Sequence, residues 1–262
     1  MHVEWKGHSV EIREAGGGPA VVLLHGYPLD GAMWSAVARA LSARFRVVKP
    51  DLPGRGDNPA PAPGGIEGYA DFVEAVLAAL PPPVGLAGFS MGGYVALALM
   101  KRGPESVRAL ALVDTRAAAD DVAGKAKRGE AIAALRAHGV APVADEMVGR
   151  LLFAESLGRP DLVERVRRII LRQKPETLES DLTAMRDRPD STDFLKQIAV
   201  PTLIVVGEHD AISTPVECRA MAAEIPGARL VTISGAGHLT PMEKPKALAS
   251  ALGDFFASAL AR

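Results

Sequence analysis

Residues 84–99 have the sequence Val84-Gly85-Leu86-Ala87-Gly88-Phe89-Ser90-Met91-Gly92-Gly93-Tyr94-Val95-Ala96-Leu97-Ala98-Leu99. A short apolar run comes first and predicts a buried strand. An Ala-rich apolar run follows and predicts a buried helix. Between the two lies Gly88-x-Ser90-x-Gly92, which matches the pattern of a nucleophile elbow, a sharp turn from a strand into a helix. This stretch therefore predicts an exposed serine between a buried strand and a buried helix.

The glycines of this pattern have a steric reason. A strand that turns directly into a helix crowds the residues on either side of the turn and places the residue at its tip in a strained conformation. Gly88 and Gly92 have no Cβ, so the hydroxyl of Ser90 can stand clear of the backbone. The helix N-terminus beneath it favours developing negative charge. The alternative interpretation is a glycine-rich turn with a capping serine.

Length and composition limit the class of protein. A chain of 262 residues with alternating strands and helices is most simply one domain. Lys and Arg total 30 against 31 Asp and Glu, a balance that gives no indication of nucleic acid or of a charged membrane surface as a partner. Cys218 is the only cysteine, so no internal disulfide can form, and we expect it to be a small packing residue.

The beginning of the chain shows no basic region followed by an apolar one, and no apolar run is long enough to span a bilayer. We therefore expect no signal peptide, no membrane association and a cytoplasmic location. The one biased stretch, Pro59–Gly65, predicts a stiff surface loop.

Strands and helices alternate through most of the chain, which predicts an α/β fold with a mostly parallel central sheet flanked by helices. A hairpin is expected at the start, around Gly7-His8. The expected strands are 20–24, 45–48, 84–89, 107–113, 201–207 and 229–233, and the expected helices are 32–41, 69–80, 90–99, 215–225 and 245–260.

The alternation stops between residues 115 and 199, where the chain is helical and highly charged. Four helices are expected there, at 125–137, 143–152, 161–173 and 175–186. We interpret residues 1–114 and 200–262 as a core and residues 115–199 as a helical cap, or lid, inserted in it. Because the insertion leaves the sheet at the carboxyl edge, we expect it to cover the strand ends above Ser90. The alternative is a longer crossover packed on the back of the sheet.

A serine hydroxyl needs a base to act as a nucleophile at neutral pH. Among six histidines, His238 follows the last strand in a glycine-rich loop, and Asp210 follows the strand before it. Both lie at the edge where open α/β sheets place their sites, and the order Ser90, Asp210, His238 is the order expected for this type of site. Asp114, which also follows a strand, is the alternative acid, and His25 is expected to hold its own loop. The other histidines are His2, His8, His138 and His209.

The chain resembles the α/β-hydrolase superfamily over essentially its whole length, and within it the small esterase and enol-lactonase-like group. The resemblance rests on five stretches, which are His25-Gly26-Tyr27-Pro28, Asp51-Leu52-Pro53-Gly54-Arg55-Gly56, Gly88-Phe89-Ser90-Met91-Gly92-Gly93, Gly207-Glu208-His209-Asp210 and Gly235-Ala236-Gly237-His238. It implies an α/β-hydrolase fold and an oxyanion hole made by the backbone N–H groups of Tyr27 and Met91. Met91 is also expected there because it follows the serine at the helix start.

These roles predict a serine hydrolase that cleaves a small carboxylic ester or lactone through an acyl-enzyme on Ser90. No metal and no other cofactor is expected, because no His/Cys/Asp cluster has ligand spacing and the Gly88–Gly92 turn lacks the Gly-Lys-Ser/Thr ending of a phosphate loop. The alternatives are hydrolysis of a carbon–carbon bond, perhydrolysis, which Pro28 beside the oxyanion loop suggests, and a receptor of hydrolase fold that binds a small ligand without catalysis.

The substrate pocket is the least determined feature of the sequence. Apolar residues near the expected site are candidates for its lining, although each is also consistent with ordinary core packing. The candidates are Trp34, Phe89, Leu152, Phe153 and Leu239, with the side chain of Met91.

Overall fold

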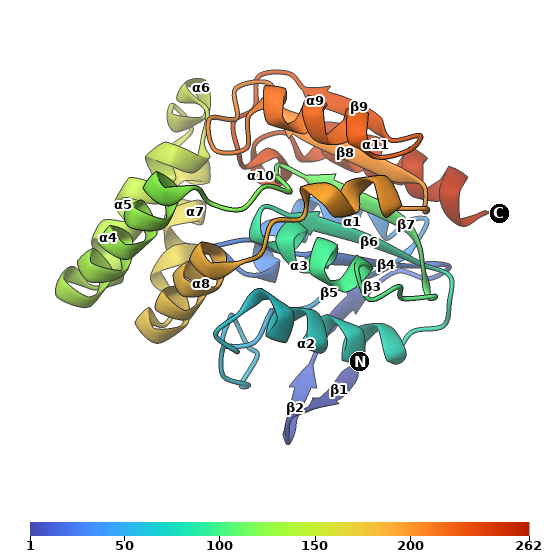
Figure 1. The fold of residues 1–262 in the computed structure, drawn as a ribbon, viewed down its shortest axis with the longest axis horizontal. Helices are drawn as coiled ribbons and strands as arrows, with labels where there is room; N and C mark the ends of the chain where they lie inside the picture. Colours follow the sequence, from blue (N-terminus) through green and yellow to red (C-terminus); the bar gives the residue numbers. More distant parts are fainter. Residues whose placement is uncertain (262) are drawn as a thin grey trace.

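In the computed structural model, which describes residues 1–261, seven strands form one twisted sheet in the order β3-β5-β4-β6-β7-β8-β9 (Figure 1). All neighbouring pairs are parallel except β3 with β5. The strands are β3 (Arg13–Ala15), β4 (Ala20–Leu24), β5 (Arg46–Lys49), β6 (Val84–Phe89), β7 (Val107–Val113), β8 (Thr202–Gly207) and β9 (Arg229–Ile233). The predicted α/β-hydrolase fold is confirmed.

Helices cover both faces of this sheet, since every residue of β4, β6 and β8 is buried. Helix α1 packs against α11, and α2 packs against α3. The helices of the core are η1 (Gly31–Trp34), α1 (Ser35–Leu41), α2 (Ile66–Ala78), α3 (Met91–Met100), α9 (Pro215–Glu224), α10 (Thr240–Glu243) and α11 (Pro245–Leu260). No helix in the described part of the chain is long and apolar enough to cross a membrane.

The predicted opening hairpin is present as β1 (His2–Trp5) and β2 (His8–Glu11), a separate two-stranded sheet. Its Trp5 packs edge-on against Phe72 of α2, with ring centroids 5.6 Å apart. The next strand, β3, was not predicted, because its three residues are all exposed and carry no alternating pattern. The predicted helix 32–41 is divided into a 3-10 turn, η1, and the α-helix α1.

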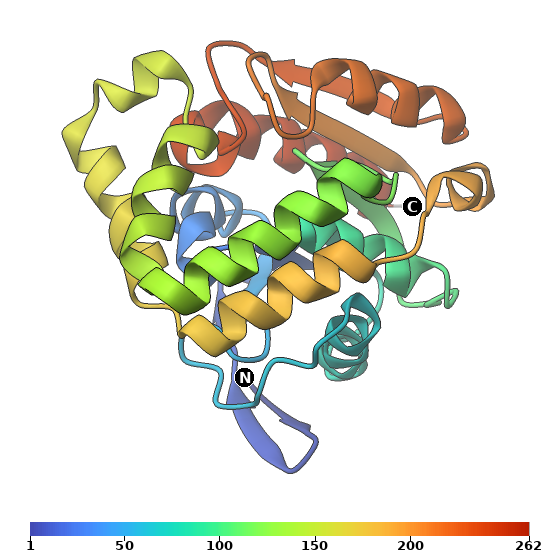
Figure 2. The ribbon, with the colours of Figure 1, turned by 60° about the vertical axis from the view of Figure 1, so that its left-hand side comes forward.

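The cap segment, defined as residues 115–199, lies between β7 and β8, as predicted. It contains α4 (Val122–His138), α5 (Val140–Leu151), α6 (Ala154–Leu157), α7 (Pro160–Leu171), α8 (Pro175–Asp187) and η2 (Thr192–Gln197). Four of these correspond to the predicted helices, whereas the short α6 and η2 were missed. Helices α4 and α8 lie side by side, and the α4–α8 group gathers at one end of the sheet (Figures 1 and 2).

Two ion pairs, one of them fully buried, attach the cap segment to the core. Arg55, in the loop after β5, pairs with Asp181 of α8, and both side chains are fully buried. Arg172, just after α7, donates to Asp30 before η1 through Nε at 2.6 Å. The orientation of the cap segment therefore depends on charges that lie far apart in the sequence.

Candidate active site

Ser90 lies at the tip of the turn between β6 and α3, with φ 50° and ψ −115°. A Cβ at position 88 would lie 2.8 Å from the Cα of Gly93, and one at position 92 would lie 2.6 Å from the carbonyl oxygens of Leu24 and His25. Contacts this close leave no space for a side chain, so both positions require glycine. The strained turn expected from the glycine spacing is present.

His238 and Asp210 complete a hydrogen-bonded chain with Ser90. The Nε2 atom of His238 lies 3.0 Å from Ser90 Oγ, and its Nδ1 lies 2.8 Å from Oδ2 of Asp210. The other carboxylate oxygen of Asp210 accepts the backbone N–H groups of Ile212 and Ser213 at 2.8 and 2.9 Å. Asp210 is thereby fixed so that it accepts from Nδ1–H and leaves Nε2 free to accept the serine proton. The sequence predicted these three residues at the carboxyl edge of the sheet, and in the structure they are in contact.

Asp114, the alternative acid, lies at the end of β7 with φ 46° and has other partners. One carboxylate oxygen accepts the Gly207 N–H at 2.9 Å, and the other accepts a hydrogen bond from the hydroxyl of Thr240. Burial raises the pKa of Asp114 well above its ordinary value, and the nearby Asp210 raises it further. Asp114 therefore braces β8 and α10, while Asp210 occupies the position beside His238.

Glu243 is a residue that the sequence reasoning missed. Its buried carboxylate accepts three backbone N–H groups, from Gly237 at 2.9 Å, Leu239 at 3.2 Å and Phe153 at 2.8 Å. Two of these flank His238 and the third belongs to the cap segment. In the sequence, Glu243 is a lone acidic residue in the short segment between His238 and the proline that begins α11. Sequence alone does not distinguish a buried acidic residue at such a position from an exposed one.

The loop from His25 to Pro28 passes against Ser90. A Cβ at Gly26 would lie 3.0 Å from that of Ser90. The neutral ring of His25 accepts the Leu52 N–H through Nε2 at 3.0 Å, and burial lowers its pKa to about 4. As predicted, His25 holds this loop, by tying the end of β4 to the loop after β5.

The two candidate oxyanion donors flank Ser90 from different elements. Tyr27 follows Gly26 in the loop, and Met91 is the first residue of α3, where N–H groups have no partner within the helix. Burial raises the pKa of the Tyr27 phenol to about 12, and the Arg55 guanidinium lies 5.9 Å from its ring.

The candidate pocket residues lie around His238. Phe89 contacts His238 at a centroid distance of 5.1 Å, and Trp34 packs edge-on against Phe89 at 6.3 Å. Leu152 and Leu239 are buried, and the half-buried Phe153 stacks on His209 at 3.9 Å. Their contact with a substrate stays a prediction. A cavity of about 890 Å³ lies beside this group, and neither these residues nor the triad line it.

The comparisons with known proteins agree with this geometry. A sequence model of the alpha/beta hydrolase family matches residues 21–251. The chain belongs to the α/β-hydrolase family. The similarity extends over almost the whole fold, including the β6–α3 turn, the loop that carries His238 and the cap segment between β7 and β8.

Several relatives of this α/β-hydrolase have named activities. It is 32% identical to a pimeloyl-[acyl-carrier protein] methyl ester esterase of Neisseria meningitidis, over 90% of this chain and 92% of that one. A thermophilic esterase from Thermogutta terrifontis has a TM-score of 0.93 at 35% identity, covering 99% and 98% of the two chains. The enol-lactonase from Burkholderia xenovorans LB400 has a TM-score of 0.89 at 27% identity, covering 98% and 100%. The chain is an α/β-hydrolase of the esterase type.

Proposed function

We propose that the protein hydrolyses small carboxylic esters through an acyl-enzyme on Ser90, with His238 as the general base and Asp210 as the carboxylate that orients it. The observation that carries the proposal is the unbroken chain from Ser90 Oγ through the His238 ring to Asp210, at 3.0 and 2.8 Å. These contacts match the roles of nucleophile, general base and orienting carboxylate.

The proposed reaction begins when Ser90 Oγ attacks the ester carbonyl and His238 Nε2 takes its proton. Asp210 holds the ring in the correct tautomer and stabilises its positive charge. The N–H groups of Tyr27 and Met91 stabilise the oxyanion of the tetrahedral intermediate, each by about 3 kcal/mol. His238 then protonates the leaving alcohol, and water hydrolyses the acyl-enzyme with the same base.

We infer that the cap segment acts as a lid over this site and is a unit distinct from the core. Support comes from its direct attachment to the His238 loop, where the Leu239 N–H donates to the Leu151 carbonyl at 3.0 Å. The exposed fraction is only 8% for Ser90 and 2% for His238. A cover of this kind excludes water and strengthens the electrostatic interactions beneath it.

The proposed substrates are esters with small or medium acyl groups. Aromatic residues make up only 5% of the chain, and no described helix offers a long apolar surface for docking on a lipid aggregate. Because two of the relatives are methyl ester esterases, we propose a small alcohol as the leaving group. The enol-lactonase neighbour at 27% identity makes lactone hydrolysis the second candidate.

A panel of p-nitrophenyl esters from acetate to dodecanoate, with methyl esters and lactones, tests the proposal against the Ser90→Ala variant. We expect hydrolysis of short and medium esters by the wild type and none by the variant. A preference for long-chain triglyceride emulsions would contradict the acyl range. Turnover only of a diketone, or only of hydrogen peroxide with a carboxylic acid, would contradict ester hydrolysis.

A further inference from the structure

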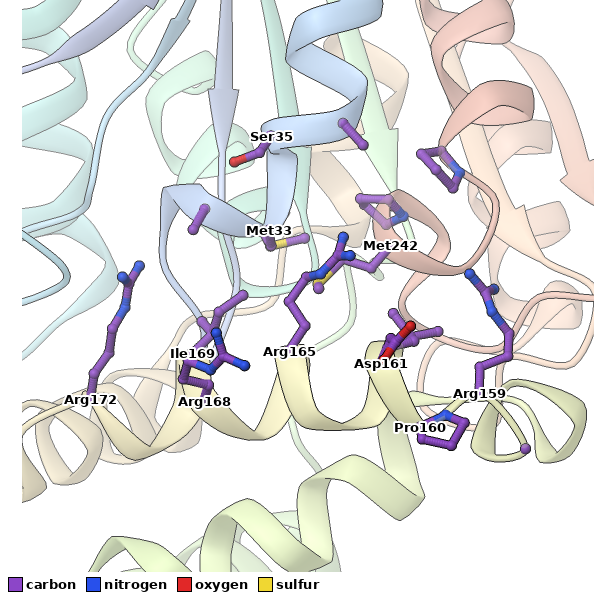
Figure 3. Close-up of a pocket in the computed structure, with 16 residues that line it drawn as sticks. Met33, Ser35, Arg159, Pro160, Asp161, Arg165, Arg168, Ile169, Arg172 and Met242 are labelled. Atoms are coloured by element: carbon purple, nitrogen blue, oxygen red, sulfur yellow. The ribbon is translucent and has the colours of Figure 1, made fainter.

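The cavity of about 890 Å³ has a composition unlike that of the catalytic site. It is a groove between α7 of the cap segment and three elements of the core, η1, α1 and α10 (Figure 3). Its volume lies within the range of small-molecule sites. Four arginines from α7 and its flanks line it, namely Arg159, Arg165, Arg168 and Arg172. We refer to this cavity as the arginine groove.

Carboxylates of the protein neutralise only part of this charge. Asp161 is the one acidic residue in the lining, and Asp30 binds Arg172 through two hydrogen bonds. Glu164 lies 3.7 Å from Arg168, so four cations face three carboxylates and one positive charge is in excess.

The arginines that carry this excess have weak partners. Within residues 1–261, Arg165 has no carboxylate within 4.0 Å. Arg168 has only Glu164 at 3.7 Å, an exposed pair on one helix that contributes little. Arg159 donates to a neutral carbonyl, that of Glu243, at 3.1 Å.

The opposite wall of the arginine groove is apolar. Met33 of η1 and Met242 of α10 lie on this wall and are themselves buried, and Ala32, Ala36 and Pro245 form its more exposed part. Figure 3 shows Arg165 extending from α7 toward Met33 and Met242. A ligand that fits this surface has an anionic end for the arginines and an apolar body for the opposite wall.

We propose that the arginine groove binds an organic phosphate, with the phosphate held by Arg165 and Arg168 and the apolar body against Ala32, Ala36 and Pro245. A phosphate monoester carries a charge of about −1.5 to −2 at pH 7 and offers three acceptor oxygens, which guanidinium groups bind in pairs. A monocarboxylate carries one charge and offers two oxygens, so it satisfies fewer of the guanidinium N–H groups of Arg165 and Arg168. None of the triad residues lines the arginine groove, so the site is separate from Ser90 and independent of ester hydrolysis.

Calorimetric titration with hexyl phosphate tests this proposal, with inorganic phosphate and hexanoate as comparison ligands. Wild type and Ser90→Ala are expected to bind hexyl phosphate equally, and more tightly than either comparison ligand. Because both guanidinium groups bind the phosphate, the double variant Arg165→Gln/Arg168→Gln is expected to lose at least about tenfold in affinity. Raising the salt concentration weakens the wild-type binding.

The matched control is Arg167→Gln, on the same helix. Arg167 pairs with Asp145 at 2.7 Å and does not line the arginine groove, so its loss leaves binding unchanged. An equal loss of affinity in this control, no binding of hexyl phosphate at millimolar concentration, or hexanoate binding as tightly as hexyl phosphate overturns the proposal. Binding that disappears in Ser90→Ala overturns the separation of the two sites, whatever the outcome for ester hydrolysis.

Discussion

The edge of the sheet that carries the triad and the cap segment are held in place by different means. At the edge, backbone geometry positions the groups: Ser90 has φ 50°, and short loops directly after β8 and β9 carry Asp210 and His238. In the cap segment, amphipathic helices form locally, and buried ion pairs such as Arg55–Asp181 fix their place on the core. The proposed chemistry therefore depends on local sequence, whereas the position of the cap segment depends on contacts between distant residues.

The largest effect expected from this contrast is at Asp210. Asp210→Asn holds the wrong tautomer of His238 and is expected to lower kcat by about 10⁴-fold. Asp114→Asn is expected to change kcat less than about threefold, because Asp114 is hydrogen-bonded to Gly207 and Thr240 rather than to His238. Steady-state kinetics on a p-nitrophenyl ester measures both, and the opposite ranking would assign the acid to Asp114.

The next effect lies at the attachment of the cap segment. Asp181→Asn leaves the Arg55 guanidinium buried without its counter-charge and is expected to destabilise the protein by about 3–5 kcal/mol. Urea unfolding measures this change in the free energy of unfolding. The control is Glu179→Gln on the same helix, which removes the exposed pair with Arg136 and is expected to leave the unfolding midpoint nearly unchanged. Equal effects from both variants would show that the buried pair does not hold the cap segment.

Glu243 joins the two regions, because its carboxylate accepts N–H groups from the His238 loop and from Phe153. In Glu243→Gln the side-chain NH₂ faces one of these donors and leaves it unpaired, which costs about 1–3 kcal/mol. We expect lower stability together with a lower kcat, since displacement of a catalytic group by about 1 Å can cost 10²-fold. Unfolding and kinetics on one preparation test this, and lost stability with unchanged kcat would limit Glu243 to attachment of the cap segment.

Much of the triad edge was predictable from the sequence, because its determinants are local. The glycines around Ser90 and the loops after β8 and β9 give a pattern that any reader of the chain can find, and Pro215 and Pro245 mark the starts of α9 and α11. The remaining features have no local signal. Strand β3 is three exposed residues that pair with β5, and the arginine groove combines segments near residues 33, 165 and 242.

The smallest expected effect concerns His25, which braces the edge. In the unfolded chain His25 takes up a proton near its ordinary pKa of 6.5, whereas the folded protein keeps it neutral down to about 4. The unfolded state therefore binds more protons between these values, and the free energy of unfolding falls as the pH falls from 6.5 toward 4. His25 is expected to contribute about 2 kcal/mol to the loss of stability between pH 7.5 and 5.0.

Urea unfolding at the two pH values measures this effect. His25→Gln is expected to show the smaller loss on acidification, and His138→Gln, at an exposed position on α4, is expected to behave as the wild type. A loss on acidification that is the same in all three proteins would contradict the assignment.

The most direct test of the central claim, that Ser90 is the nucleophile, is labelling with a fluorophosphonate followed by mass spectrometry of the peptides. The account predicts one adduct per chain, on the peptide that contains Ser90, and no adduct in the Ser90→Ala variant. An adduct on another residue, or labelling that survives the substitution, would contradict it.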